Sequence, residues 1–321
     1  MSTLIFGARW TSRSWLRLTT SIIEMSTKET SGDDIACGVP VYSRTEALGQ
    51  FLKSVPEYVA TVYIAENGPQ PSREERAALY DDRSWPFALE VLDLDVDVGI
   101  GRCREAICEA LSKPYLWMGD CDMMFVDVGD LRRLRGVLES NPDLGGVSGW
   151  LLEGGSVRSG ARQLVEHGGR LIKAVEEPPE IKGDETPFAR FDFIPQAGLF
   201  RADVYDTYSY DPDIQNTEHV DFFYSHAQRG EWKFASTPAV LVQHNRWIDE
   251  EYRRSRRGSD HVDAALLEEK HGISNIAPGS DTDWAGYRDR SVKERLFEAF
   301  RASTPPRVWM PTRRLLRRVV G

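Results

Sequence analysis

The chain has 321 residues, 41% of them hydrophobic, and a formal net charge of −10 at pH 7. This length is enough for one large α/β domain with appendages or for two small domains. The acidic balance argues against general binding to nucleic acid, because no net basic field exists to attract a polyanion. The cysteines form no C-x-x-C pair, which favours reduced thiols in an intracellular protein (Cys37, Cys103, Cys108 and Cys121).

The hydropathy of the chain predicts neither a membrane span nor a signal peptide. No apolar stretch approaches the roughly 18–20 residues that cross a bilayer. Arginines interrupt the hydrophobic residues near the N-terminus, so this region lacks the continuous apolar core of a secretory signal. We therefore expect a cytoplasmic protein, either soluble or attached peripherally to the cytoplasmic face of a membrane.

Between residues 35 and 125 the sequence repeats a strand–loop–helix unit. Short apolar runs predict four strands (35–41, 61–65, 87–94 and 114–118). Helical spacing or a charged stretch predicts a helix after each of the first three strands (45–55, 72–80 and 101–111). Ser43 and Glu46 match a capping box at the start of the first helix. This alternation implies a parallel, doubly wound α/β sheet, in which ligands bind beyond the carboxyl ends of the strands.

The second half of the chain is less regular. Further strands are predicted at 147–151, 170–175 and 234–243, and residues 191–200 are rich in aromatic residues and glycine. A helix is predicted to begin at Asn216 or Thr217, either of which can cap it, and to end near Gln228. We divide the chain into an N-terminal extension, a domain of two halves and a basic C-terminal tail (1–34, 35–125 with 126–275, and 276–321).

Asp120 and Asp122 form the most informative motif, Asp-Cys-Asp, because they follow the apolar run 114–118 directly. Two carboxylates at the exit of a buried strand cost free energy if they are desolvated without a counter-charge. A divalent cation would supply that charge, and carboxylate oxygens suit the hard ions Mg²⁺ and Mn²⁺. The sequence therefore predicts a metal site at the carboxyl edge of the sheet.

Other polar motifs follow the remaining strands. Val39-Pro40-Val41-Tyr42-Ser43-Arg44 closes the first strand and Glu66-Asn67-Gly68 closes the second. Gly99 and Arg104 lie in the stretch before the fourth strand, Glu218-His219-Val220-Asp221 opens a late helix, and His244 closes the last strand. Together with Asp120 and Asp122, these motifs resemble the family 2 glycosyltransferases of the GT-A fold over residues 35–245.

The resemblance implies a Rossmann-like, mostly parallel sheet with a mixed acceptor-side half, so that 35–125 binds a nucleotide and 126–275 receives the acceptor. It implies that a nucleotide-sugar donor, most simply a UDP-sugar, contacts eight residues (Pro40, Tyr42, Arg44, Glu66, Asn67, Gly99, Arg104 and Asp120). It implies that Mn²⁺ or Mg²⁺ is bound by Asp120, Asp122 and His244.

The activity implied is an inverting, metal-dependent transfer of a hexosyl or N-acetylhexosaminyl group to a glycan or polyprenyl-linked acceptor. The acceptor hydroxyl needs a general base. Glu218 and Asp221 are candidates, and their spacing puts both carboxylates on one helical face. His219 is the third candidate, because it stands where the family commonly has the aspartate assigned as the base. The sequence leaves the choice open.

Two other functions fit the same fold. A nucleotidyltransferase can share the acidic pair, but it normally has a glycine-rich loop bearing arginine or lysine after the first strand, and residues 39–44 lack that loop. A nucleotide-sugar-binding module without catalysis would explain His219 in place of the usual aspartate. Binding without turnover would distinguish this module from an enzyme.

The last 21 residues carry six arginines and no acid on an otherwise acidic protein. Leu315, Leu316, Val319 and Val320 fall at helical spacing, which is typical of a basic amphipathic helix. Such a helix would bind anionic lipid, as suits an enzyme with a lipid-linked acceptor. A tail docked on the protein's own acidic surface is an equal alternative.

Overall fold

The computed structural model describes residues 34–82, 84–175, 179–245, 260–278 and 283–284. All of these fall within the unit Gly32–Gly321, whereas the other unit, Met1–Ser31, lies outside the described residues. The basic segment at the end of the predicted tail lies outside them too. The predictions for the two ends of the chain therefore stay predictions.

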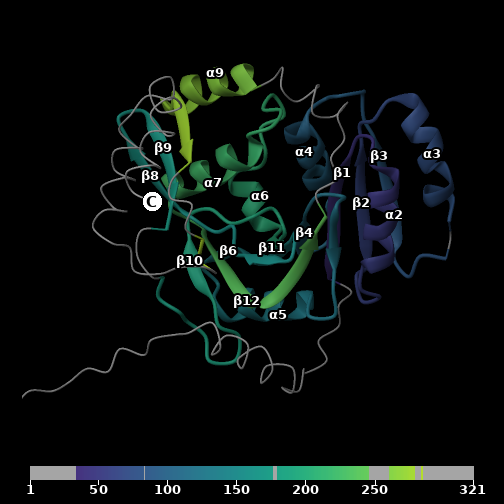
Figure 1. Ribbon diagram of the computed structural model, residues 1–321, viewed down its shortest axis with the longest axis horizontal. Coiled ribbons are helices and arrows are strands. Elements are labelled where there is room, and N and C mark those ends of the chain that lie inside the picture. The colour runs from purple at the N-terminus through teal and green to yellow at the C-terminus, as the bar shows by residue number, and fades with distance from the viewer. Residues whose placement is uncertain (1–33, 83, 176–178, 246–259, 279–282, 285–321) are drawn as a thin grey trace, which may run out of the picture. The chain divides into compact units, whose positions relative to one another are not determined.

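Four parallel strands build the first half of the main sheet: β1 (Ile35–Val41), β2 (Thr61–Glu66), β3 (Ala88–Asp93) and β4 (Tyr115–Met118). β1 pairs with β4 on one side and β2 on the other, and β3 forms the edge beyond β2. The helices that follow the first three strands are α2 (Thr45–Ser54), α3 (Gln70–Asp81) and α4 (Ile100–Ala110), as Figure 1 shows. The predicted alternation is confirmed.

Helices cover both faces of this half of the sheet. Successive side chains of β1 point to opposite faces, and each set packs against a different helix. Cys37 belongs to one hydrophobic core together with Phe51 of α2. Ala36 belongs to a second core together with Ile107 of α4. Gly38 lies so close to α4 that a Cβ atom there would be 2.5 Å from Cγ2 of Ile107. With both faces covered, the carboxyl edge of the sheet is where loops can form a site.

The other half of the sheet is mixed, as predicted. Its strands are β5 (Met123–Phe125), β6 (Leu144–Glu153), β7 (Ser156–Arg158), β10 (Ala189–Phe191), β11 (Gly198–Arg201) and β12 (Lys233–His244). β11 runs antiparallel to both β4 and β6, and it joins the two halves. The long strand β12 pairs with β6 in parallel and with β5 and β10 in antiparallel fashion.

The helices that follow strands of this half include α5 (Leu131–Ser140), α6 (Asp203–Thr207) and α7 (Glu218–Arg229). Phe222 and Phe223 of α7 lie in the second core, where the ring of Phe223 contacts that of Phe234 on β12 at a centroid distance of 4.8 Å. Among the described residues, no helix combines the length and apolar character that a bilayer crossing requires.

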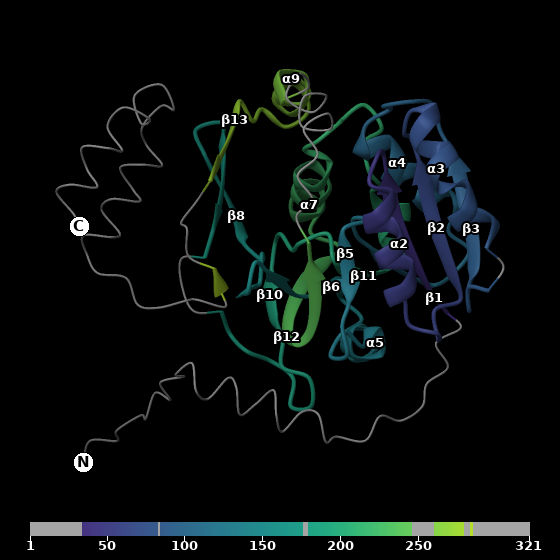
Figure 2. The same cartoon turned by 45° about the vertical axis from the view of Figure 1, so that its right-hand side comes forward.

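A second, three-stranded sheet consists of β8 (Gln163–His167), β9 (Arg170–Ala174) and β13 (Asn275–Pro278). The helix α9 (Asp260–His271) precedes β13 and lies near α7 in both views (Figures 1 and 2). β13 crosses the boundary that we placed at residue 275 and pairs in parallel with β9. Trp284 is buried against Trp150 with a ring distance of 5.1 Å. Described residues on the C-terminal side of 275 therefore pack against strands of the preceding half.

The expected helix caps did not form. The N-cap of α2 is Arg44, not Ser43, and it makes no side-chain capping bond. The side chain of Arg44 is instead bonded to Asp122, across the carboxyl edge of the sheet. Thr217 is the N-cap of α7, as one of our two alternatives had it, but its side chain does not cap the helix either. Neither helix therefore begins with the side-chain cap that its sequence spacing suggests.

Candidate active site

Asp122 and His244 lie side by side because of a strand pairing. β5 follows Asp122 directly, and its first residue, Met123, is paired with His244 at the end of β12. The amide of Asn245 also donates to the carbonyl oxygen of Asp122 at 2.9 Å. As a result, Nε2 of His244 is 3.6 Å from Oδ1 of Asp122. Two residues of the predicted metal set are therefore adjacent, although they are far apart in sequence.

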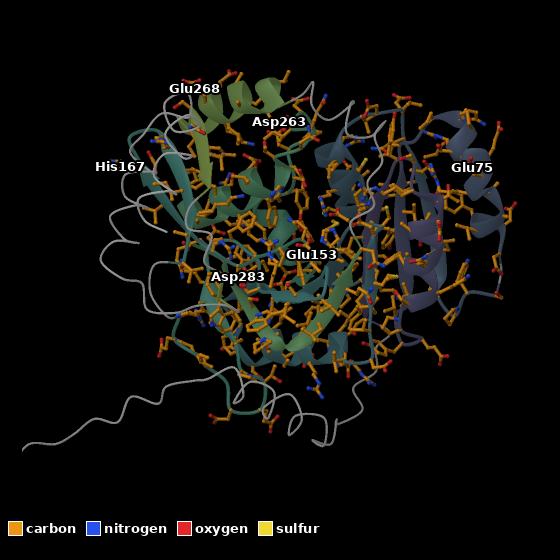
Figure 3. All side chains as sticks on the ribbon, viewed as in Figure 1. Glu75, Glu153, His167, Asp263, Glu268 and Asp283 are labelled. Atoms are coloured by element: carbon orange, nitrogen blue, oxygen red, sulfur yellow. The ribbon has the colours of Figure 1, made fainter. Side chains whose placement is uncertain are left out.

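Both side chains are held by further charged groups. Nη1 of Arg44 donates to Oδ2 of Asp122 at 2.5 Å. Nδ1 of His244 is 2.9 Å from Oε1 of Glu153, at the end of β6 (Figure 3). Burial lowers the pKa of His244, but the nearby carboxylates of Asp122, Asp120 and Glu153 outweigh burial and raise it. The imidazole is thus oriented between two carboxylates.

The donor atoms at this point fit a divalent cation. Oδ1 of Asp122 is buried and accepts no hydrogen bond from any described residue, which is costly for a carboxylate unless something else binds it. Carboxylate oxygen and imidazole nitrogen together suit Mn²⁺, and Mg²⁺ also accepts one or two carboxylates when phosphates and waters complete its shell. Within the described ranges, no three His, Cys, Asp or Glu side chains are grouped to hold a metal ion by themselves. Phosphate oxygens of a donor and waters would complete the shell of a cation bound there.

Arg104 connects Asp120 to α7. This buried guanidinium, on α4, donates to Oδ1 of Asp120 at 2.7 Å and to Oε1 of Glu218 at 3.1 Å. Burial lowers the pKa of Arg104, but the two carboxylates outweigh it, so the pKa is raised and the side chain stays charged. Glu218 and Arg104 are 114 residues apart in the chain. The predicted donor side and acceptor side thus meet through one arginine.

The three base candidates on α7 have different surroundings. Asp221 is fully buried, and its oxygens accept from the hydroxyl of Tyr208 at 2.5 Å and contact Nζ of Lys270 at 3.1 Å and Nε2 of His271 at 2.7 Å. Burial raises the pKa of Asp221, but these bonds outweigh it and lower the pKa. We expected Glu218 and Asp221 to share one helical face, but their side chains have different partners. Glu218 contacts Arg104, whereas Asp221 contacts residues of α9.

His219 is the most accessible of the three. Its side chain is 31% exposed, whereas that of Glu218 is 3% exposed, and Nδ1 of His219 is 3.6 Å from Oε1 of Glu218. The imidazole ring lies 5.5 Å from the ring of Phe193. An incoming hydroxyl group can reach His219 with less rearrangement than it would need to reach either carboxylate.

Glu66 has a different environment from the one that we expected. Oε2 accepts from Nε of Arg76 at 2.7 Å and from the hydroxyl of Tyr80 at 2.5 Å, and Oε1 accepts from Nη2 of Arg76 at 2.6 Å and from the amide of Gly68 at 2.9 Å. Both oxygens are buried in this network. Internal donors occupy the carboxylate that we expected to meet the base and ribose, so Glu66 holds the loop after β2 in place.

Asn67, the residue after Glu66, has a polar atom left for a ligand. Nδ2 donates to Sγ of Cys103 at 2.8 Å, while Oδ1 is buried and accepts no hydrogen bond from the described residues. Gly99 supports backbone packing, because its φ of 88° is in the left-handed region and a Cβ there would be 3.1 Å from Gln215. Pro40 lies inside β1, paired with Ala65 of β2.

The carbonyl oxygen of Tyr42 accepts from Nη2 of Arg76 at 3.0 Å.

Sequence reasoning missed three residues near the candidate site: Arg76, Glu153 and Asp263. Arg76 lies in a charged helix that looks solvated, and only its spacing of 10 residues from Glu66 hints at a pair. Glu153 could have been noticed as an acid near the end of a predicted strand. No local signal marks Asp263, whose partners are 46 to 48 residues away.

No protein-family model and no curated protein sequence matches this chain. Among solved structures, that of GalNAc-T7 with UDP, GalNAc and Mn²⁺ is similar at a TM-score of 0.52 and 12% identity, over 75% of this chain and 55% of that one. The chain has the GT-A fold. The structure of S. aureus TarS 1–349 has a TM-score of 0.47 at 8% identity, covering 73% of this chain and 65% of that chain.

A third structure is that of the mannosyltransferase PcManGT from Pyrobaculum calidifontis in complex with GDP-Man and Mn²⁺. Its TM-score is 0.48 at 10% identity, and the match covers 80% of this chain and 71% of that chain. The chain thus spans less than two thirds of TarS 1–349 and of GalNAc-T7. At these identities the likeness concerns the GT-A fold and leaves the chemistry to the residues at the site.

Proposed function

We propose that this protein is an inverting, metal-dependent glycosyltransferase that takes a hexosyl or N-acetylhexosaminyl group from a nucleotide-diphosphate donor, most simply a UDP-sugar. The observation that carries the proposal is the buried Oδ1 of Asp122, which has no hydrogen-bond donor among the described residues and faces His244 at 3.6 Å. The GT-A fold supports it, because GalNAc-T7, which has a similar fold, was solved with UDP, GalNAc and Mn²⁺.

On the donor side, Asp122 and His244 would hold Mn²⁺ or Mg²⁺, with Asp120 beside them. The cation would supply Lewis-acid stabilisation for the charge that develops on the leaving nucleotide. Arg44, whose side chain is 18% exposed, lies within reach to share its charge between Asp122 and a diphosphate oxygen. Oδ1 of Asn67 would accept a hydrogen bond from the nucleobase, in the place that we expected Glu66 to take.

On the acceptor side, we assign the general base to His219. Its imidazole is the accessible group, and Glu218 lies on its Nδ1 side while Arg104 fixes Glu218. Removal of the hydroxyl proton by Nε2 would let the acceptor oxygen displace the nucleotide in one step, which inverts the anomeric carbon. Asp221, engaged by Lys270 and His271, has a structural role.

The acceptor class and the location of the protein are proposed from its sequence. A glycan or a polyprenyl-linked acceptor at the cytoplasmic face of a membrane suits the basic C-terminal segment, which lies outside the described residues. The alternative of that segment docked on the protein itself remains equal. Co-sedimentation with anionic vesicles, comparing the full chain with one ending at residue 284, distinguishes the two.

A donor screen tests the proposal. The full chain is incubated with a panel of UDP- and GDP-sugars in Mn²⁺ or Mg²⁺, with and without EDTA, and release of the nucleoside diphosphate is measured. We expect turnover of one donor that EDTA abolishes and Mn²⁺ restores. Turnover that ignores chelation would contradict the metal assignment. Binding of nucleotide without turnover across many acceptors would favour the inactive module, and pyrophosphate release would favour the nucleotidyltransferase.

A further inference from the structure

The three residues that precede α7 are held by a residue from another helix. The amides of Gln215, Asn216 and Thr217 donate to the carboxylate of Asp263 at 2.9, 2.7 and 2.9 Å, and the Thr217 hydroxyl adds a bond of 3.2 Å. Asp263 is labelled on α9 in Figure 3. Three successive backbone N–H groups thus converge on one side chain, immediately before the first turn of α7.

Asp263 is fully buried, so its charge must be compensated inside the protein. The four hydrogen bonds and the positive end of the α7 dipole provide that compensation. In return, Asp263 fixes the backbone immediately before Glu218. The N-cap residue Thr217 makes no side-chain capping bond, and its amide and hydroxyl donate to Asp263 instead.

The same segment is held on its other side by α4. The amide of Ile100 donates to the carbonyl of Gln215 at 2.9 Å, and that of Gly101 donates to the carbonyl of Ile214 at 3.2 Å. A Cβ at Gly101 would lie 2.3 Å from the carbonyl oxygen of Ile214, so only glycine allows this approach. Because Arg104 is on α4 and Glu218 follows the clamped segment, the clamp determines how these two side chains meet.

We infer that Asp263 is a positioning residue: by fixing residues 215–217 against the start of α4, it places Glu218 on Arg104 and His219 where an acceptor hydroxyl can reach it. The inference rests on the proposed function for its catalytic consequence, while the placement of the first turn of α7 can be measured without turnover. Asp263 touches neither substrate nor metal in this assignment.

The test compares Asp263→Asn with Lys270→Met. Both residues belong to α9, but Lys270 contacts the side chains of Asp211 and Asp221, neither of which is among residues 215–217. Asparagine removes the charge and turns an N–H₂ group towards backbone N–H groups. We expect Asp263→Asn to lower kcat by about 10²-fold, the order expected when a catalytic group moves by an ångström, with the Kd for UDP unchanged. Lys270→Met should keep kcat close to that of the wild type, even if its melting temperature falls.

A second readout follows the imidazole of His219 by ¹H–¹³C NMR, assigned through His219→Gln. Its ring signals should shift in Asp263→Asn and stay in place in Lys270→Met. If Asp263→Asn does not fold, Asp263→Glu, which keeps the charge but displaces it by one methylene, takes its place with the same expectation. Unchanged kcat and unchanged His219 signals would overturn the inference. Absence of turnover in the wild type would instead refute the proposed function and leave the NMR comparison decisive for Asp263.

Discussion

The loop after β2 and the loop after β4 each carry a buried carboxylate at the same edge of the sheet, but they differ in how its oxygens are satisfied. Glu66 receives four hydrogen bonds, from Arg76, Tyr80 and Gly68. Asp122 receives Arg44 on Oδ2, while Oδ1 has no hydrogen-bond donor among the described residues. A carboxylate with all its bonds made stabilises a loop, and one with a bond unmade is suited to a ligand.

The difference follows from where the partners come from. Arg76 and Tyr80 belong to α3, the helix that directly follows the loop, so a local segment can saturate Glu66. The neighbours of Asp122 come from the start of α2 and the far end of β12, which are brought together only when the two halves of the sheet are joined. A buried acid at a strand end whose partners come from the next helix, such as Glu66, is structural. One whose partners come from distant segments, such as Asp122, is suited to bind a ligand.

Asp122→Ala should produce the largest loss of activity. It removes the buried carboxylate oxygen that lies 3.6 Å from Nε2 of His244. We expect kcat/KM for the donor to fall by about 10³-fold, because charge stabilisation of the leaving group is lost. Isothermal titration with Mn²⁺ in the presence of UDP should show weaker binding. Asp120→Ala leaves the pair of Asp122 and His244 intact, so its Mn²⁺ binding should fall less than that of Asp122→Ala, although we expect its donor binding to weaken as well. Near-normal transfer by Asp122→Ala would contradict the metal site.

His219→Gln should come next. Loss of the general base is expected to lower kcat by at least about 10²-fold while the affinity for UDP stays the same. Asp221→Asn is the control on the same helix, and its main effect should be a lower melting temperature. A dead Asp221→Asn that is fully folded, together with an active His219→Gln, would move the base back to Asp221.

Glu66→Gln should instead destabilise the protein. Removing one partner of the buried pair with Arg76 leaves an uncompensated guanidinium, which costs about 3–5 kcal/mol of unfolding free energy. Urea unfolding measures this loss. Turnover per folded molecule, counted by UDP binding, should stay near that of the wild type. A large loss of UDP affinity with unchanged stability would return Glu66 to the nucleotide site.

The sequence predicted the parallel half well because each of its elements is defined locally. Strands such as β1 are short apolar runs buried on both faces, and α2 shows helical spacing. The same local reading failed at the caps of α2 and α7, where Arg44 turns to Asp122 and Asp263 takes the amides before Glu218. Both contacts join segments far apart in the chain, which spacing within one helix cannot reveal.

In the candidate site, too, the residues could be predicted from motifs, whereas their contacts with distant segments could not. The resemblance named Asp122 and His244, and the pairing of β5 with β12 places them together. It also named Asp221, whose spacing from Glu218 suggested a shared role. The contacts of Asp221 with Lys270 and His271 could not be predicted, because α9 returns to α7 only through the tertiary fold.

The smallest expected effect is on the pH dependence of stability and comes from His226. Like Asp122, this buried side chain has a polar atom without a hydrogen bond to any described residue. It lies in α7, fully buried, with Nε2 3.1 Å from the carbonyl oxygen of Tyr208 and Nδ1 without a hydrogen bond to any described residue. Burial lowers the pKa of His226 to about 4, so the ring is neutral in the folded protein at pH 6, where the unfolded chain binds a proton. Stability contributed by this residue is therefore full above its ordinary pKa of 6.5 and is lost as pH falls from there towards 4.

This loss should amount to about 3 kcal/mol over the window, at 1.36 kcal/mol per pKa unit. Urea unfolding between pH 7 and pH 4 measures it, and His226→Phe, which keeps an aromatic ring among Phe222 and Phe234, should flatten the dependence. His244 does not mimic the effect, because its raised pKa adds stability that is lost as pH rises. The lowered pKa of Asp221 acts below the ordinary aspartate value, outside most of the window. An unchanged slope in His226→Phe would show that other groups carry the dependence, and that Nδ1 of His226 has a partner in solution.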